Sequence, residues 1–441
     1  MNAYETLRSK GISLSDIIEI KWRGIEIKGE LMPSSEVNGE DIIILKLENG
    51  YNIGVSISEI EDIKRISSGS KIESFPEAKL EGSSNKKIAI VTTGGTIGSR
   101  VDYKTGGVYM LLKPEQLLYN VQEINSIAKI ELSPLFSIAS EDMTYIEWQK
   151  IAKEAERLSR EEDIEGIIVT IGTDTMHYAS AALSFMLKEI KLPIVLTGAQ
   201  RSSDRGSSDA FMNLICSSYI ALSDIAEVGV CMHASSSDDR CHFIRGTKAR
   251  KMHTSRRDAF RPINDLPIAE VDTIGNIIYK SSYRKKDTSD RDSFKALVGF
   301  ERKVALVKMH PNIDPSIISY YTDKGYKGII IEGTGLGHVA ISTEHKEFNW
   351  KESIKYAIDN GVIIGMTSQC LYGRVNDSVY RNLRIISGLG VIYCEDMLPE
   401  TALVKLSWLL GNFKEEDAKQ LLNKNLVGEI SDRTRFHEFM N

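Results

Sequence analysis

The segment EGIIVTIGTDTMHYASAALSFML, residues Glu165–Leu187, carries the pattern on which the fold prediction depends. Its first part is a short run of β-branched apolar residues, typical of a buried strand, and its last part has the composition of a helix. The polar turn Gly172–Thr175 joins the two parts. A strand that passes through a tight turn into a helix is the repeating unit of a parallel α/β sheet. The segment therefore predicts such a sheet.

The same order of strand and polar turn occurs before and after this segment. In KKIAIVTTGGTIGSR (Lys86–Arg100), an apolar run enters a turn of threonines and glycines at Thr92–Gly98. In LPIVLTGAQRSSD (Leu192–Asp204), a second apolar run ends in another polar turn, and Val228–Ala234 predicts a fourth strand. Open parallel sheets bind ligands at the carboxyl ends of their strands. The three turns are therefore expected to share one pocket.

Two further regions flank the predicted sheet. Short β-branched stretches around an Asn49-Gly50 hairpin signal predict a small β-barrel near the start of the chain. Apolar strands resume after Val304 and predict a second α/β region. We therefore expect a barrel with its linker over residues 1–80, a larger α/β domain over 86–280, and a smaller α/β domain with a helical tail over 300–441.

Composition excludes several classes of protein. The formal net charge of −6 gives no global basic field for nucleic acid. No apolar stretch is long enough to span a membrane, and MNAYETLRSK has no apolar core of a signal peptide. The five cysteines are odd in number and scattered, which fits reduced thiols. These observations predict a cytoplasmic protein that does not associate with membranes.

Two common kinds of site are poorly supported. The glycines of Gly94–Gly98 match neither the dinucleotide nor the phosphate-loop pattern, so nucleotide binding is not expected. A zinc site at Cys231, His233, Cys241 and His242 is also disfavoured, because these residues lack Cys-x-x-Cys spacing. A buried core cysteine and an interior histidine explain Cys231 and His233 better. We expect no metal.

Threonine chemistry remains. A threonine hydroxyl is a poor nucleophile unless a base takes its proton. Thr173 lies beside Asp174, and RGTKARKMHTSRRDAFR (Arg245–Arg261, the basic segment) offers Lys248 and Lys251. A lysine crowded by other cations would have a lowered pKa and could act as a base oriented by Asp174. The flanking arginines are interpreted as a solvated loop or a nucleic-acid patch.

The motifs TTGGTIGSR, GTDTMHYASAAL, LTGAQR, TKARKMHTS and EGTGLGH occur in this order and together resemble the bacterial-type asparaginase/glutaminase family. The resemblance covers about Lys86 to Gly411. With the preceding barrel, and with RKMHTSRRDAFR and EDMLPETALVKLSWLLG, the chain is more similar to the D subunits of archaeal glutamyl-tRNA(Gln) amidotransferases. The resemblance implies a two-domain asparaginase-like α/β fold preceded by a small N-terminal β-barrel.

The resemblance also implies catalytic roles. Thr96 matches the family's nucleophile on a mobile loop. Thr173, Asp174 and Lys251 match a second cluster that activates the nucleophile or water. Attack on a side-chain amide would release ammonia, leave an acyl-threonine, and after hydrolysis give glutamate or aspartate.

Five further residues are expected to bind the substrate: Ser140, Glu141, Gly95, Gly172 and Tyr109. Ser140 and Glu141 match residues that hold the substrate's α-carboxylate and α-amino groups, although many relatives carry Gln in place of Glu141. The glycines let the backbone approach the amide, so that nearby N–H groups can stabilise an oxyanion. The loop tyrosine is Tyr109 or Tyr103, and spacing from Thr96 favours Tyr109.

The resemblance finally implies partners. An ammonia-supplying subunit needs a partner that binds tRNA, and ATP and Mg are expected on that partner, with no cofactor on this chain. Glutamine or asparagine would be the substrate, Glu-tRNA(Gln) would be reached through the complex, and a homodimer within a heterotetramer is expected. Two alternatives remain open: a free-standing L-asparaginase, and a non-catalytic subunit that binds tRNA through its barrel and the basic segment.

Overall fold

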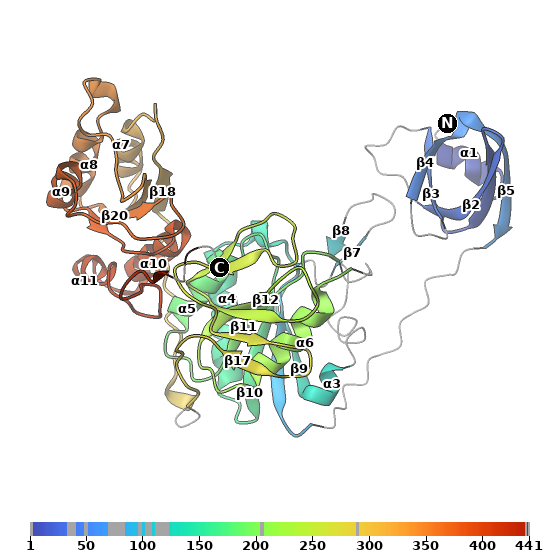
Figure 1. The fold of residues 1–441 in the computed structure, drawn as a ribbon, viewed down its shortest axis with the longest axis horizontal. Helices are drawn as coiled ribbons and strands as arrows, with labels where there is room; N and C mark the ends of the chain where they lie inside the picture. The colour runs from blue at the N-terminus through green and yellow to red at the C-terminus, as the bar shows by residue number, and fades with distance from the viewer. Residues whose placement is uncertain are drawn as a thin grey trace. The chain divides into compact units, whose positions relative to one another are not determined.

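The computed structural model describes residues 3–32, 41–47, 52–68, 84–95, 99–101, 108–110, 123–202, 207–287, 291–436 and 439. Their contacts divide the chain into two units, residues 1–78 with 98–119, and residues 79–97 with 120–441. Figure 1 shows the helices and strands of each unit. The division of the chain into the three predicted domains, with limits at 80, 86, 280 and 300, stays a prediction.

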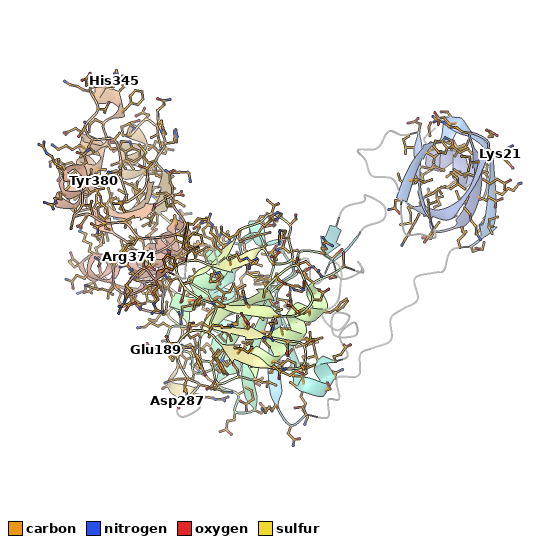
Figure 2. All side chains as sticks on the ribbon, viewed as in Figure 1. Lys21, Glu189, Asp287, His345, Arg374 and Tyr380 are labelled. Carbon is orange, nitrogen blue, oxygen red and sulfur yellow. The ribbon has the colours of Figure 1, made fainter. Side chains whose placement is uncertain are left out.

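The first unit is a small antiparallel β structure, as predicted. Its main elements are α1 (Ala3–Ser9), β1 (Ile17–Trp22), β2 (Ile25–Met32), β3 (Ile42–Lys46), β4 (Asn52–Ser56) and β5 (Ile60–Ser67). The strands pair in the order β4-β3-β2-β1-β5, and Figure 1 shows the sheet curving around its core. Ile18, Ile20 and Ile43 are fully buried there, whereas Lys21 of β1, labelled in Figure 2, points into solvent.

One hairpin lies where the sequence predicted it. β3 and β4 pair antiparallel from Ile42–Ser56 to Lys46–Asn52, which confirms the hairpin expected there. Asn49 and Gly50 themselves lie outside the described residues. Two further short strands, β7 (Ser99–Val101) and β8 (Val108–Met110), pair antiparallel.

The second unit contains a mixed eight-stranded sheet. Its strands are β6 (Lys87–Thr92), β9 (Lys129–Pro134), β10 (Ile164–Thr170), β11 (Ile194–Thr197), β12 (Val228–His233), β13 (Cys241–Arg245), β16 (Ala269–Val271) and β17 (Ile277–Tyr279). They lie in the order β17-β16-β13-β12-β11-β10-β6-β9. From β9 to β12 the neighbours are parallel, and from β12 to β17 they are antiparallel. The parallel part confirms the predicted α/β sheet.

Helices cover both faces of the parallel strands. They are α3 (Ile124–Ile127), α4 (Tyr145–Ser159), α5 (Met176–Met186) and α6 (Ala210–Ala221). Ile167 and Val169 of β10 pack into the core beside α4 and α5. Ile168 points to the opposite face and is also fully buried. Because both faces are covered, the strands are continuously apolar and do not alternate, as is typical of parallel sheets.

A second, four-stranded parallel sheet follows in the same unit. It consists of β18 (Val304–Lys308), β19 (Gly328–Gly333), β20 (Ile363–Ser368) and β21 (Ile392–Tyr393), with α7 (Ser316–Asp323), α8 (Trp350–Asp359) and α9 (Arg381–Gly388). α10 (Pro399–Asn412) packs against α5, where the Phe185 and Trp408 rings stack at 5.5 Å. One hydrophobic core therefore runs from the first sheet through α10 to the second.

The predicted helical tail is helical only in part. After α11 (Glu415–Leu421), the backbone N–H groups of Leu426 and Val427 donate to the Glu429 carboxylate, and this arrangement replaces a helix. Glu429 also forms an ion pair with Lys405 of α10 at 2.6 Å, and neither side chain is exposed. Among the described helices, none is both long and apolar enough to cross a membrane.

The Lys405–Glu429 pair generates a stability prediction. Glu429→Ala leaves the Lys405 ammonium buried without its carboxylate, and breaking a buried pair in this way costs about 3–5 kcal/mol. We expect denaturant unfolding to show a loss of that size. Lys419→Ala, an exposed change on α11, is the control and should alter the free energy of unfolding by less than about 0.5 kcal/mol. Equal effects of the two substitutions would contradict the importance of the pair.

Candidate active site

Three turns meet at the carboxyl edge of the parallel strands. Gly95, after β6, has φ +87°, and a Cβ placed on it would lie 2.5 Å from the backbone nitrogen of Gly172. A Cβ on Gly172 would lie 2.8 Å from Ser140 Oγ, and one on Gly198 would lie 3.2 Å from Thr173 Cγ2. Only glycines permit such close backbone contacts. The three turns therefore lie at one edge of the sheet, and the pocket that they were expected to share stays a prediction.

Lys251 joins the two residues of the second predicted cluster. It lies on the short strand β14 (Ala249–Lys251), which pairs with β15 (Phe260–Pro262). Its Nζ lies 3.0 Å from Thr173 Oγ1 and 2.6 Å from Asp174 Oδ1. The Lys251 side chain is only 10% exposed, whereas that of Asp174 is 66% exposed. A hydroxyl, an amine and a carboxylate therefore lie in hydrogen-bonding contact and can exchange a proton.

Ser140 lies beside this cluster. It is buried, its carbonyl oxygen accepts a hydrogen bond from Thr175 Oγ1 at 2.6 Å, and its Oγ has no partner among the described residues. An unpaired buried hydroxyl next to Gly172 is available to a ligand. Glu141 follows in the same 3₁₀ turn (Ser140–Asp142) and is exposed.

Other predicted site residues are less fully described. Thr96 and Tyr103 lie outside the described residues. Tyr109 lies on β8 opposite Arg100, and its side chain is not described. Thr93 donates its hydroxyl to the Thr170 carbonyl at 2.8 Å and so ties β6 to β10. The roles assigned to Thr96 and Tyr109 stay predictions.

The cations of the basic segment are paired in the structure, which differs from the crowding that the sequence suggested. All seven of its cations have carboxylate partners: Arg245 with Glu227 and Asp265, Lys248 with Asp396, Arg250 with Glu400, Lys251 with Asp174, Arg256 and Arg261 with Asp258, and Arg257 with Asp238. The expected cationic crowding around a lysine is therefore wrong, because each neighbouring charge is offset. Between the two candidate lysines, Lys248 is buried against Asp396, and only Lys251 contacts Thr173.

Sequence reasoning missed His177, on the first turn of α5. Its burial, and then the charges of Arg250 and Lys251, lower the pKa of His177 to about 4. The imidazole is therefore neutral near pH 7, and its Nδ1 has no partner among the described residues. The only signal in the sequence was its place three residues after Asp174, within the GTDTMHYASAAL motif.

A buried polar network holds the third turn. Asp209 accepts hydrogen bonds from the backbone N–H groups of Gln200 and Arg201, and Asn213 Nδ2 donates to the Gly198 carbonyl. His233 contacts Asn213 Oδ1 at 2.6 Å through Nδ1. The interpretation of His233 as an interior histidine is confirmed, and Cys231 is likewise fully buried.

Three family descriptions match the chain. Residues 12–66 match the family described as GatD N-terminal domain, residues 87–287 match Asparaginase, N-terminal, and residues 303–422 match Glutaminase/Asparaginase C-terminal domain. The last two matches contain all the site residues described above.

Proteins of similar sequence and structure agree with these matches. The chain is 47% identical to the D subunit of the glutamyl-tRNA(Gln) amidotransferase of Pyrococcus furiosus over 100% of both chains. It is 45% identical to the corresponding protein of Sulfolobus acidocaldarius over 97% of this chain and 94% of the relative. The thermostable L-asparaginase from Thermococcus kodakarensis is similar in structure, with a TM-score of 0.68 and 27% identity over 78% of this chain and 99% of that one. L-asparaginase I from Vibrio cholerae is also similar in structure, with a TM-score of 0.67 and 28% identity over 79% of this chain and 100% of that one.

The contacts of Lys251 generate a prediction. Lys251→Arg keeps the positive charge but cannot deprotonate, so it removes a base without removing a cation. We expect ammonia release from glutamine or asparagine to fall by about 10²–10⁴-fold, as it should in Lys251→Ala. The control is Lys280→Arg, which changes a lysine paired with Glu270 and should leave the rate unchanged. Substantial activity in Lys251→Arg would make Lys251 a positional residue only.

Proposed function

Because the chain belongs to the family of glutamyl-tRNA(Gln) amidotransferase D subunits, we propose that it hydrolyses the side-chain amide of free glutamine or asparagine with a threonine nucleophile. It thereby supplies ammonia to a partner that converts Glu-tRNA(Gln) to Gln-tRNA(Gln). The observation that carries this proposal is the hydrogen-bonded set of Thr173, Lys251 and Asp174 at the carboxyl edge of the sheet. Gly95, Gly172 and Ser140 lie beside this set.

The proposed reaction has two halves. In the first, the Thr96 hydroxyl oxygen attacks the amide carbon, a base takes the hydroxyl proton, and the carbon–nitrogen bond breaks as the nitrogen leaves with a proton as ammonia. In the second, water attacks the acyl-threonine and releases the free amino acid with the Thr96 hydroxyl restored. Lys251 is the base for the nucleophile or for water, Thr173 lies between it and the substrate, and Asp174 orients its amine.

Backbone geometry supports oxyanion stabilisation in this reaction. The turns at Gly95 and Gly172 are in van der Waals contact because neither residue has a side chain. Backbone N–H groups near Thr96 and Thr173 can therefore point at one carbonyl oxygen of the substrate. We assign the substrate's α-carboxylate and α-amino groups to Ser140 and Glu141, and the covering loop to Tyr109.

The two alternatives are less well supported. A non-catalytic subunit that binds tRNA through the barrel and the basic segment would need free cations there. Instead, the cations of the basic segment are paired, and residues 1–68 hold twelve Asp or Glu against eight Lys or Arg. The hypothesis of a free-standing L-asparaginase assigns no function to residues 12–66, although these residues match a domain of the amidotransferase subunit.

The assembly is proposed on chemical grounds. Conversion of a tRNA-linked glutamate to an amide needs activation of the carboxylate, and the sequence carries no recognisable nucleotide motif for that step. We assign ATP, Mg and tRNA to the partner subunit, and we propose a homodimer of this chain within a heterotetramer. The expected cytoplasmic location stays a prediction.

The two threonines provide a direct test. Thr96→Val and Thr173→Val each replace a hydroxyl by a methyl group of similar size, so the fold should survive. We expect each variant to lose nearly all release of ammonia from glutamine and asparagine, with circular dichroism spectra unchanged. Thr322→Val, at a hydroxyl on α7 that donates to the Ile318 carbonyl within the same helix, is a matched control and should stay active. Near-normal glutaminase activity in Thr96→Val would reject the proposed nucleophile.

The partner provides a second test. A ligand can shift a mobile loop only by binding its closed form more tightly, so tRNA on the partner can accelerate hydrolysis only through such coupling. We expect slow hydrolysis by the isolated chain and much faster hydrolysis by the complex with glutamylated tRNA. Steady-state ammonia assays on the chain, the complex, and the complex plus charged tRNA measure this. Full speed without partner and tRNA would favour the free-standing asparaginase.

A further inference from the structure

The strand that carries Lys251 is very short. β14 covers only Ala249–Lys251 and forms a two-stranded sheet with β15, so few backbone hydrogen bonds fix its position. Nevertheless Lys251 must lie within hydrogen-bonding distance of both Thr173 and Asp174. The position of β14 therefore depends on contacts other than those of its own sheet.

Some of those contacts are made with α5, and others come from the start of α10. Lys248 Nζ lies 2.7 Å from Asp396 Oδ2, and the Thr401 hydroxyl donates to the Thr247 carbonyl at 3.0 Å. Arg250 forms an ion pair with Glu400. Asp396, Glu400 and Thr401 lie just before or within the first turn of α10, where Pro399 fixes the backbone. Three successive contacts thus attach the residues around β14 to one helix end.

The same helix also supports the other half of the site. α10 packs along α5, and α5 begins directly after the turn that holds Thr173 and Asp174. The separation between Lys251 and Thr173 is therefore set by two elements that both rest on α10. A change at the start of α10 should move Lys251 relative to Thr173, because α5 is held by Trp408, which lies further along the same helix.

Of the three contacts, the Arg250–Glu400 ion pair lies nearest to Lys251 in the chain. Its side chain is 10% exposed, and that of Arg250 is 26% exposed, so solvent screens the pair only partly. Arg250 is adjacent to Lys251 in the chain, and in an extended strand the two side chains point to opposite faces. We propose that Glu400 is a positioning residue that acts through Arg250 to hold Lys251 against Thr173 and Asp174, an inference that rests on the proposed role of Lys251.

Glu400 also lies beside the groups around the site. Burial, and then the Glu400 charge, raise the pKa of Tyr178 to about 12, and Arg250 opposes that shift. The charges of Arg250 and Lys251 in turn lower the pKa of His177. The Glu400 carboxylate thus offsets the Arg250 charge next to the site and also fixes the direction of that side chain. Its second oxygen, Oε2, is buried and has no hydrogen-bond partner among the described residues.

Glu400→Gln removes the charge and keeps the size of the side chain. In the complex with its partner subunit, we expect kcat for amide hydrolysis to fall roughly 10- to 100-fold with KM unchanged, because misplacement of a catalytic group by about 1 Å has an effect of that size. Arg250→Gln should behave alike, and the double variant should be no worse than either single variant, because both remove one interaction. Glu400→Asp keeps a carboxylate and should recover most of the rate.

The matched control is Glu165→Gln. Glu165 forms an ion pair with Lys286, whose side chain is 11% exposed, but Glu165 itself is 38% exposed and lies near the amino end of β10, away from the carboxyl edge. This variant should leave kcat unchanged. A fall in kcat equal to that of Glu400→Gln would overturn the proposal, since the effect would then be a general loss of stability.

A second measurement separates this proposal from the proposed function. The rate at which an amine-specific reagent labels Lys251, followed by peptide mass spectrometry, reports its surroundings whether or not it is catalytic. We expect faster labelling in Glu400→Gln than in the native chain or in Glu165→Gln. Faster labelling with unchanged kcat would support the positioning and reject the catalytic role of Lys251. Unchanged labelling of Lys251 would overturn the positioning.

Discussion

The candidate site depends on a close approach of two backbones. Gly95 and Gly172, in the turns after β6 and β10, lie so near each other that a methyl group on either would collide with its neighbours. This contact lets the segment leaving β6 and the segment leaving β10 share one small volume with Ser140 and Thr173. A parallel sheet places its strand ends at one edge, but only the absence of side chains at these two positions brings the polar groups within reach of one ligand.

The parallel strands and the polar turns that follow them could be predicted from the sequence, for physical reasons. Strands buried on both faces are continuously apolar, so β6, β10 and β11 stand out, and their polar turns follow at once. Three-residue strands such as β14 and β16 are too short to show any period. The ion pairs of the basic segment join residues up to 150 positions apart in the sequence, as Arg250 and Glu400 do, so local charge suggested crowding where the folded chain has pairing.

The second sheet is more than an appended domain. The helix that follows it, α10, contributes Trp408 to the core beneath α5, and Glu400 of α10 and Asp396 just before it pair with the segment around Lys251. The site residues that contact the predicted substrate come from the first sheet, yet their arrangement depends on a helix that follows the second. This dependence explains why the family motifs extend through EDMLPETALVKLSWLLG, which contains no residue assigned to the chemistry.

The buried pair of Lys405 and Glu429 also orders events during synthesis. The ribosome completes α10 before it adds Glu429, so a nascent chain holds Lys405 without the carboxylate that offsets its burial. Water must therefore keep access to that ammonium until residues 426–431 have been made. We therefore expect the core that joins the two sheets to close only when residues 426–431 are in place, and the junction to be finished only then.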